Sequence, residues 1–386
     1  MIQAESSSPA PAERILDAAR TRLAAGGFRD LTLRPLAEAS GATVAALTYH
    51  FGSKGQLIER LVAIEREADA ARHAAFAQRF ADLPGLRPGA IAALLEAYLD
   101  EAAGPARVTS LIWCELLLAA VNDPEARSLI APWITARRAF WRELFAGRVD
   151  DPAAWANAAM GYVTDETVHS LAQDGEADYR LMRRMTLERL AGRGDGLGLS
   201  DPAFFEAVVR RLDPALELPG PASREPFSGR AQSIALAAGE VIVARGAEGV
   251  THRAVGERAE APASSVAYHF RTRLDLLHAG LTVIYLVAQG RLTPPQGPVE
   301  AFVARGTISV ALAAAREPEL RPYAVDLRRL RGENLRRRLA ERTGAEIDLC
   351  TAQCASIARL GATLLARAAG QDPPLGVVDW IVGRET

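Results

Sequence analysis

The sequence predicts an all-α protein organised as two tandem units, each with a short three-helix domain followed by a larger helical domain. Three observations support this prediction. Apolar residues recur at helical spacing along most of the chain, no segment shows the strict alternation of a half-buried strand, and one segment occurs twice. A chain of 386 residues is also long enough for two or more domains of ordinary size.

The repeated segment gives the domain organisation. Residues 31–51 recur as residues 250–270 at a constant offset and without gaps. The same offset matches further apolar and glycine residues: Ile15 with Ile234, Gly27 with Gly246 and Leu57 with Leu276. Farther along, residues 122–127 resemble residues 316–321 at a shorter offset. We therefore expect a duplication that extends into the downstream regions.

Segments dense in glycine and proline separate the two copies, at residues 192–198 and 214–226. The expected domains are a first three-helix domain at 11–60, a first helical domain at 61–213, a linker at 214–228, a second three-helix domain at 229–278 and a second helical domain at 279–386. Helical periodicity predicts the longer helices at 91–103, 108–121, 128–145, 155–171, 201–212, 276–289, 299–316, 321–341 and 345–369.

Composition narrows the functional class without deciding it. The formal net charge is −2, so any basic surface for nucleic acid has to be local. Three cysteines, Cys114, Cys350 and Cys354, are too few for a disulfide framework and are expected in the core. No run of about 18 apolar residues and no basic-then-apolar leader stands out, which predicts a cytoplasmic location.

The first copy has the pattern of a helix-turn-helix. Thr32 suits the N-cap of a short helix over residues 33–39, and residues 40–42 form a turn. Thr43 can cap the second helix, expected over residues 44–50, because its hydroxyl can accept from a free N–H of the first turn. In this motif the second helix enters the major groove, where base edges distinguish all four pairs.

The side chains of that second helix suit DNA. Thr43, Val44 and Ala45 are short enough for close approach to base edges, with one hydroxyl and apolar surface for a thymine methyl. Tyr49, His50 and the only lysine of the chain, Lys54, can donate to phosphates. Such contacts position the protein without carrying sequence information.

This arrangement resembles the N-terminal domain of the TetR family over residues 13–61. The resemblance is carried by Ala18-Ala19, Gly27, Thr32, Leu36-Ala37, Gly41, Leu47, Tyr49-His50-Phe51 and Lys54. It implies an all-helical regulator, usually a homodimeric repressor, whose C-terminal domain binds a small effector. Carried over by position, the family's DNA contacts fall on Thr32, Arg34, Thr43, Val44, Ala45, Thr48, Tyr49, His50 and Lys54. Many members carry an aromatic residue where this chain has Thr48.

The second copy keeps the aromatic and cationic positions on an altered turn. Its expected DNA-binding residues are Thr251, Arg253, Ser264, Ser265, Tyr268, His269 and Arg273. Glu260 stands at the position of Gly41, which is unfavourable for a residue with a Cβ if φ is positive there. Pro262 replaces the capping threonine. The second copy therefore reads a different half-site, or it has lost DNA binding and serves as a pairing surface.

Other clusters have both a functional and a structural interpretation. The aromatic-rich first helical domain suggests an effector pocket at Trp113, Phe140, Trp141, Trp155, Tyr162 and His169, although core packing explains the same residues. No cofactor, metal site or catalytic group is predicted. The arginines of residues 328–331 and 336–338 are expected on a solvated helix face, paired with acids such as Glu333 and Glu341.

Three functional hypotheses follow. The leading one is a single-chain pseudo-dimer that presents two readers to an operator with unlike half-sites. The second is a homodimer that uses only the first readers, in which substituting Tyr268 and His269 leaves operator affinity unchanged. The third is a ligand-binding or adaptor protein that no longer binds DNA, and an enzyme is a distant further possibility.

Overall fold

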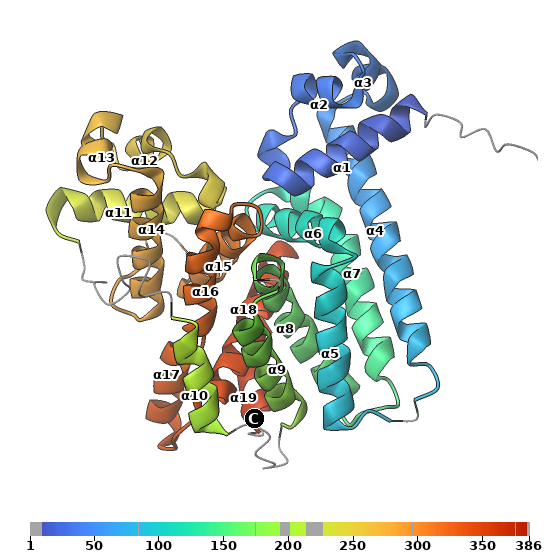
Figure 1. The fold of residues 1–386 in the computed structure, drawn as a ribbon, viewed down its shortest axis with the longest axis vertical. Coiled ribbons are helices and arrows are strands. Elements are labelled where there is room, and N and C mark those ends of the chain that lie inside the picture. The colour runs from blue at the N-terminus through green and yellow to red at the C-terminus, as the bar shows by residue number, and fades with distance from the viewer. Residues whose placement is uncertain are drawn as a thin grey trace, which may run out of the picture.

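The computed structural model describes residues 10–83, 85–173, 175–193, 201–213, 227–294, 297–374 and 376–383. Within these ranges the regular secondary structure is helical and no β-strand occurs, which confirms the all-α prediction. In Figure 1 two groups of short helices lie at the upper end of the molecule, and a bundle of longer helices fills the lower part. We call residues 10–213 the first half and residues 227–383 the second half.

The first half begins with four helices in the predicted order. They are α1 (Pro11–Asp30), α2 (Leu33–Ser40), α3 (Val44–Phe51) and α4 (Lys54–Arg79). Ile15, Leu36, Leu47 and Leu57 are buried between them, so the apolar stripe seen in the sequence forms a small core. The long α4 then leads away from the short helices into the bundle (Figure 1).

Six further helices complete the first half: α5 (Pro88–Ala103), α6 (Arg107–Ala120), α7 (Pro124–Phe145), α8 (Pro152–Ala172), α9 (Ala177–Ala191) and α10 (Pro202–Arg211). Proline occupies the first turn of α5, α7, α8 and α10, where its missing N–H costs no hydrogen bond. The helix over residues 177–191 was not predicted. Tyr179, Met182 and Leu187 form its buried face, but the arginines between them obscure the apolar periodicity in the sequence.

The second half also begins with short helices. They are α11 (Gly229–Arg245), the 3-10 turn η2 (Ala247–Gly249), α12 (His252–Arg258), α13 (Ala263–His269) and α14 (Arg273–Ala288). The bundle part contains α15 (Val299–Ala314), η3 (Pro318–Leu320), α16 (Arg321–Arg329), α17 (Glu333–Thr343), α18 (Leu349–Ala368) and α19 (Val377–Val382).

The single helix predicted over residues 321–341 is wrong, because the chain breaks into α16 and α17. Gly332 lies at the break with φ +85, and a Cβ built there would lie 2.5 Å from the carbonyl carbon of Ala352. Both the left-handed backbone and the close approach of α18 favour glycine at this position. Long-range packing that the local pattern does not encode therefore ends the helix.

Helices α8 and α18 join the two halves at a close crossing. A Cβ built on Gly161 would lie 2.4 Å from the Ala358 carbonyl oxygen, and one on Gly361 would lie 1.9 Å from the Gly161 carbonyl oxygen. The two glycines face each other, so the helix backbones pack with no side chain between them. In the same region α15 and α16 also pack against α8.

The solvated face predicted for the arginines of residues 328–331 is wrong. Arg328 and Glu166 are both 0% exposed, and the Arg328 Nε lies 2.9 Å from each carboxylate oxygen of Glu166. Arg331 is also buried and donates to Asp165 at 2.9 Å and to Thr307 at 3.1 Å. The acids on α8 come from the first half, so these ion pairs lie between the halves. Only Arg336, Arg337 and Arg338 keep substantial exposure.

Helix α18 has the length and hydropathy of a membrane-spanning helix, but 89% of that window is buried within the protein. It is therefore the central core helix of the bundle. Cys350 and Cys354 on α18 and Cys114 on α6 are buried, as predicted, and form no disulfide within the described part of the chain. Burial raises the pKa of Cys114 to about 12.

Candidate nucleic-acid interface

Helices α2 and α3 form the first helix-turn-helix. Gly41 ends α2 in the left-handed region, with φ 62 and ψ 28. The Thr43 hydroxyl then accepts from the Ala46 N–H at 3.1 Å, which confirms the predicted cap of α3. Thr32 occupies the N-cap position of α2, but its side chain makes no capping hydrogen bond.

The outer face of α3 carries the residues predicted to contact DNA. Thr43, Val44, Ala45, Thr48, Tyr49 and His50 are all exposed, whereas Leu47 is buried beneath them. Tyr49 is 86% exposed, so its ring and hydroxyl are available to a partner. The Thr48 hydroxyl donates to the Val44 carbonyl of its own helix at 3.1 Å.

Two cations flank this face. Lys54 is the first residue of α4, directly after a capping box in which Ser53 and Gln56 satisfy each other's backbone N–H groups. Arg34 is exposed in the first turn of α2. The first helix-turn-helix therefore exposes short residues, aromatic donors and cations.

Helices α12 and α13 repeat the geometry on a strained turn. Glu260 has φ 51, so the condition stated for it is met, and its backbone is left-handed like that of Gly41 with φ 62. Pro262 stands at the N-cap of α13 without a side-chain cap. Tyr268 is 84% exposed, and its ring lies 5.3 Å from that of His269, the same separation as between Tyr49 and His50.

The cations of the second copy differ from those of the first. Arg273 binds Glu317 with both terminal nitrogens, at 2.7 and 3.2 Å, and also donates to the Ala247 carbonyl. This geometry argues against the phosphate contact that the sequence predicts for Arg273. Arg253 is exposed and pairs with Glu257 at 2.9 Å. Arg271 is an exposed cation just after α13 that the sequence analysis did not single out, because glycine stands at its position in the first copy.

The turn residues Gly41 and Glu260 form a matched pair for a stability test. Replacing Glu260 by Gly is expected to stabilise the protein by about 1 kcal/mol. Glycine adopts the positive φ without steric strain, and this gain exceeds the conformational entropy that glycine adds to the unfolded chain. Gly41→Ala is expected to destabilise it by a similar amount, since a Cβ there meets nothing within 4 Å and only the backbone is strained. Urea denaturation of both variants measures the effect, and equal signs would contradict it.

Arg316 contacts α1 and η2 as well as α6 of the bundle. It is 6% exposed and donates to the α1 carbonyls of Ala24 at 2.8 Å and Leu23 at 3.3 Å. It also pairs with Glu115 on α6 and, at 2.9 Å, with Glu248 of η2. One guanidinium thus ties α1 of the first half to η2 of the second half. The sequence echo at residues 316–321 marked this segment but not its role.

The six residues predicted to line an effector pocket pack in the core. All six are at most 7% exposed: Trp113, Phe140, Trp141, Trp155, Tyr162 and His169. None of them lines the cavities of about 480, 300 and 70 Å³ in the protein. Arg137 lies over the Trp113 ring at 3.9 Å and donates to the buried Asp69 at 2.8 Å. These contacts favour the core-packing interpretation.

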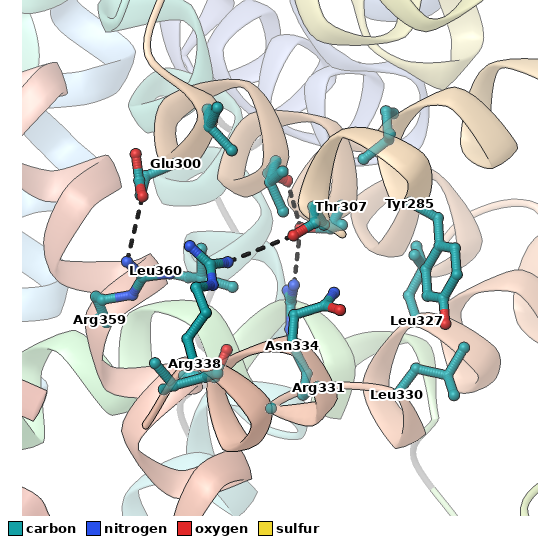
Figure 2. Close-up of a pocket in the computed structure, with 17 residues that line it drawn as sticks. Tyr285, Glu300, Thr307, Leu327, Leu330, Arg331, Asn334, Arg338, Arg359 and Leu360 are labelled. Atoms are coloured by element: carbon teal, nitrogen blue, oxygen red, sulfur yellow. Dashed lines mark hydrogen bonds and ion pairs between the residues drawn. The ribbon is translucent and has the colours of Figure 1, made fainter. Parts of the chain in front are cut away.

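A small cavity of about 70 Å³ opens instead in the second half (Figure 2). Its polar side chains include Tyr285, Glu300, Arg331 and Arg359. Arg331 is engaged by Asp165 and Thr307, and Arg359 lies 3.5 Å from Glu300. The cations of this cavity therefore already have partners within the protein.

His73 makes stability depend on pH. It is stacked 4.2 Å from Phe140 and 5.7 Å from Tyr98, and burial lowers its pKa to about 3, with Arg137 and Arg72 reinforcing and Asp69 opposing the shift. The unfolded chain takes up a proton at His73 near pH 6.5, whereas the native state does so only near pH 3. The free energy of unfolding is therefore unaffected by His73 above pH 6.5 and falls as the pH decreases from 6.5 toward 3.

We expect protonation of His73 in the unfolded chain to lower the free energy of unfolding by about 2 kcal/mol between pH 7 and pH 5. Denaturation at both pH values measures this loss. In His73→Phe the loss should shrink by that amount, whereas the exposed His269→Gln should retain it. An unchanged pH dependence in His73→Phe would exclude His73 as the cause.

The all-helical fold and the exposed α3 define a protein with a helix-turn-helix DNA-binding domain. Residues 15–61 match the family model described as "Bacterial regulatory proteins, tetR family". The crystal structure titled "multidrug binding protein EbrR complexed with imidazole" shares 25% identity, covering 47% of this chain and 95% of that chain, with a TM-score of 0.36. A comparison with curated proteins finds no significant match.

Proposed function

We propose that the chain is an effector-responsive transcriptional repressor that acts in the cytoplasm and reads operator DNA with α3. The exposed surface of α3 carries this proposal, because Tyr49, His50 and the short residues at its start are what a major-groove helix needs. Residues 15–61, which match the tetR family model, include this helix. We propose repression because it is the usual mode of regulation in that family.

We further propose that α13 is a second reader in the same chain. Its exposed Tyr268 and His269 match the first reader in ring geometry, and α12 and α13 lie at the same end of the molecule as α2 and α3 (Figure 1). The α8–α18 crossing and Arg316 hold the halves together. Half-sites read by two such helices lie about one helical turn, ~34 Å, apart.

The second candidate function is a homodimer in which only α3 reads DNA. The engagement of Arg273 by Glu317 and the uncapped α13 favour it. Under this alternative the second three-helix region is structural, and Tyr268→Ala with His269→Ala leaves operator affinity unchanged.

Binding to the DNA upstream of the chain's own gene tests the proposal. The affinity should fall as salt rises, with a slope near −0.9 for each phosphate contact. Lys54→Gln should weaken binding to all sequences and flatten the slope by about 1. Binding that is absent, or independent of salt and of Lys54, would support the adaptor interpretation instead.

A further inference from the structure

A groove between the two halves lies next to both three-helix regions. It consists of two adjoining cavities of about 480 Å³ and about 300 Å³, which share Asn122, Val243, Ala244, Arg245 and Arg305 in their walls. Asn122 follows α6 of the first half, and the others belong to α11 and α15 of the second half. Figure 1 shows α6 and α15 meeting at the centre of the molecule.

Arg305 is the chemical feature of this groove. It lies on α15, is 9% exposed and lines both cavities. Within the described residues no carboxylate pairs with its guanidinium, and its Nε has no hydrogen-bond partner. Burial lowers the pKa of Arg305 to about 10, so the group remains charged at neutral pH. A buried cation without a counter-charge is costly, and a bound anion would offset that cost.

Three of the four acids in the walls are engaged by cations, and the fourth, Asp123, is exposed and caps α7 by accepting from the Glu125 N–H. Glu240 pairs with Arg258, and Glu115 and Glu248 both pair with Arg316. Arg245 adds an exposed positive charge at the wall. Within the described residues no carboxylate of these walls pairs with Arg305, so the charge of Arg305 is not neutralised there.

Apolar side chains form a large part of the walls. Val241 and Phe302 line the larger cavity, and Leu118 and Leu312 line the smaller one. Cavities of about 300–1,000 Å³ are the size that holds small organic ligands. The cavity in Figure 2 differs, because it is smaller and its arginines have partners.

We propose that this groove binds a small amphipathic organic anion, whose carboxylate or sulfonate head meets Arg305 and whose apolar body lies against Val241 and Phe302. A phosphate of DNA is not the occupant, since Arg305 is too buried for a duplex to reach. The ligand touches both halves close to α1 and α11. If the proposed two-reader function holds, occupancy sets the spacing of the readers.

The test uses two fluorescent probes of similar apolar size and no DNA, so its outcome is separate from that of the proposed function. 8-Anilinonaphthalene-1-sulfonate carries the anionic head, and N-phenyl-1-naphthylamine lacks it. We expect Arg305→Met to weaken sulfonate binding by about 10- to 100-fold while the neutral probe changes less than about twofold. Arg305→Lys should retain most of the sulfonate affinity.

Arg359→Met is the matched control, because it removes a partly buried arginine from α18 that lines the other cavity. It should leave sulfonate binding unchanged. Arg305→Met should also raise the melting temperature by a few degrees, since it removes an unpaired buried charge. Equal loss of both probes, or unchanged sulfonate binding in Arg305→Met, would overturn the proposal.

A second variant keeps the test decisive if Arg305→Met does not fold. Ala244 is exposed and lines both cavities, so Ala244→Trp fills the groove without disturbing the core. We expect it to weaken sulfonate binding at least about tenfold. Unchanged binding in this variant would likewise overturn the assignment.

Discussion

Replacing Glu166 by Ala is expected to destabilise the protein by about 3–5 kcal/mol, because it leaves Arg328 buried without a counter-charge. Both side chains are 0% exposed, and Glu166 also accepts from the Tyr179 hydroxyl at 2.8 Å. Although burial lowers the pKa of Arg328, Glu166 more than compensates and holds that pKa above its ordinary range. Urea denaturation followed by tryptophan fluorescence measures the loss.

Two controls isolate the cause. Glu341→Ala removes the acid of an exposed pair with Arg337, and solvent screening limits its effect to less than about 0.5 kcal/mol. The double variant Glu166→Leu with Arg328→Met removes both buried charges and should recover most of the stability. A double variant no more stable than Glu166→Ala would show that lost packing, not the unpaired charge, dominates.

Introducing an acid into either reader is expected to weaken operator binding at least about 100-fold, equivalent to about 2.7 kcal/mol. Ala45 on α3 and Ser264 on α13 occupy matched positions, and both are exposed, so glutamate costs the fold little. In the major groove the new carboxylate faces phosphates and acceptor-rich base edges. Fluorescence anisotropy with labelled operator DNA measures the affinity.

Ala70→Glu is the control, since it changes the net charge equally at an exposed position of α4 away from the readers. It should change the affinity by less than about threefold. Loss of binding in Ala45→Glu but not in Ser264→Glu would identify α3 as the sole reader and favour the homodimer.

The geometry of the first helix-turn-helix was predictable because its signals are local. The Thr43 cap, the turn at Gly41 and the buried Leu47 lie within a few residues of one another, and the repeat marked Glu260 as the position of Gly41 in the second copy. Each depends on propensity and periodicity, which a single sequence contains.

The junction between the halves was not predictable in this way. The partners of Arg328 and Arg331 are acids on α8, more than 160 residues earlier in the chain, so their charge patterns look like solvated faces. The break at Gly332 and the crossing of Gly161 with Gly361 likewise depend on backbone contacts between distant helices. The aromatic cluster around Trp113 suggested a pocket because ligand pockets and protein cores are both rich in apolar and aromatic side chains.

The stoichiometry of the operator complex tests the central claim most directly. Native mass spectrometry of the protein with its minimal operator counts the chains, each of 41.3 kDa, on one duplex. Two readers in one polypeptide predict one chain for each operator, with footprints on two unlike half-sites. Two chains on each minimal operator, with a symmetric footprint, would contradict it.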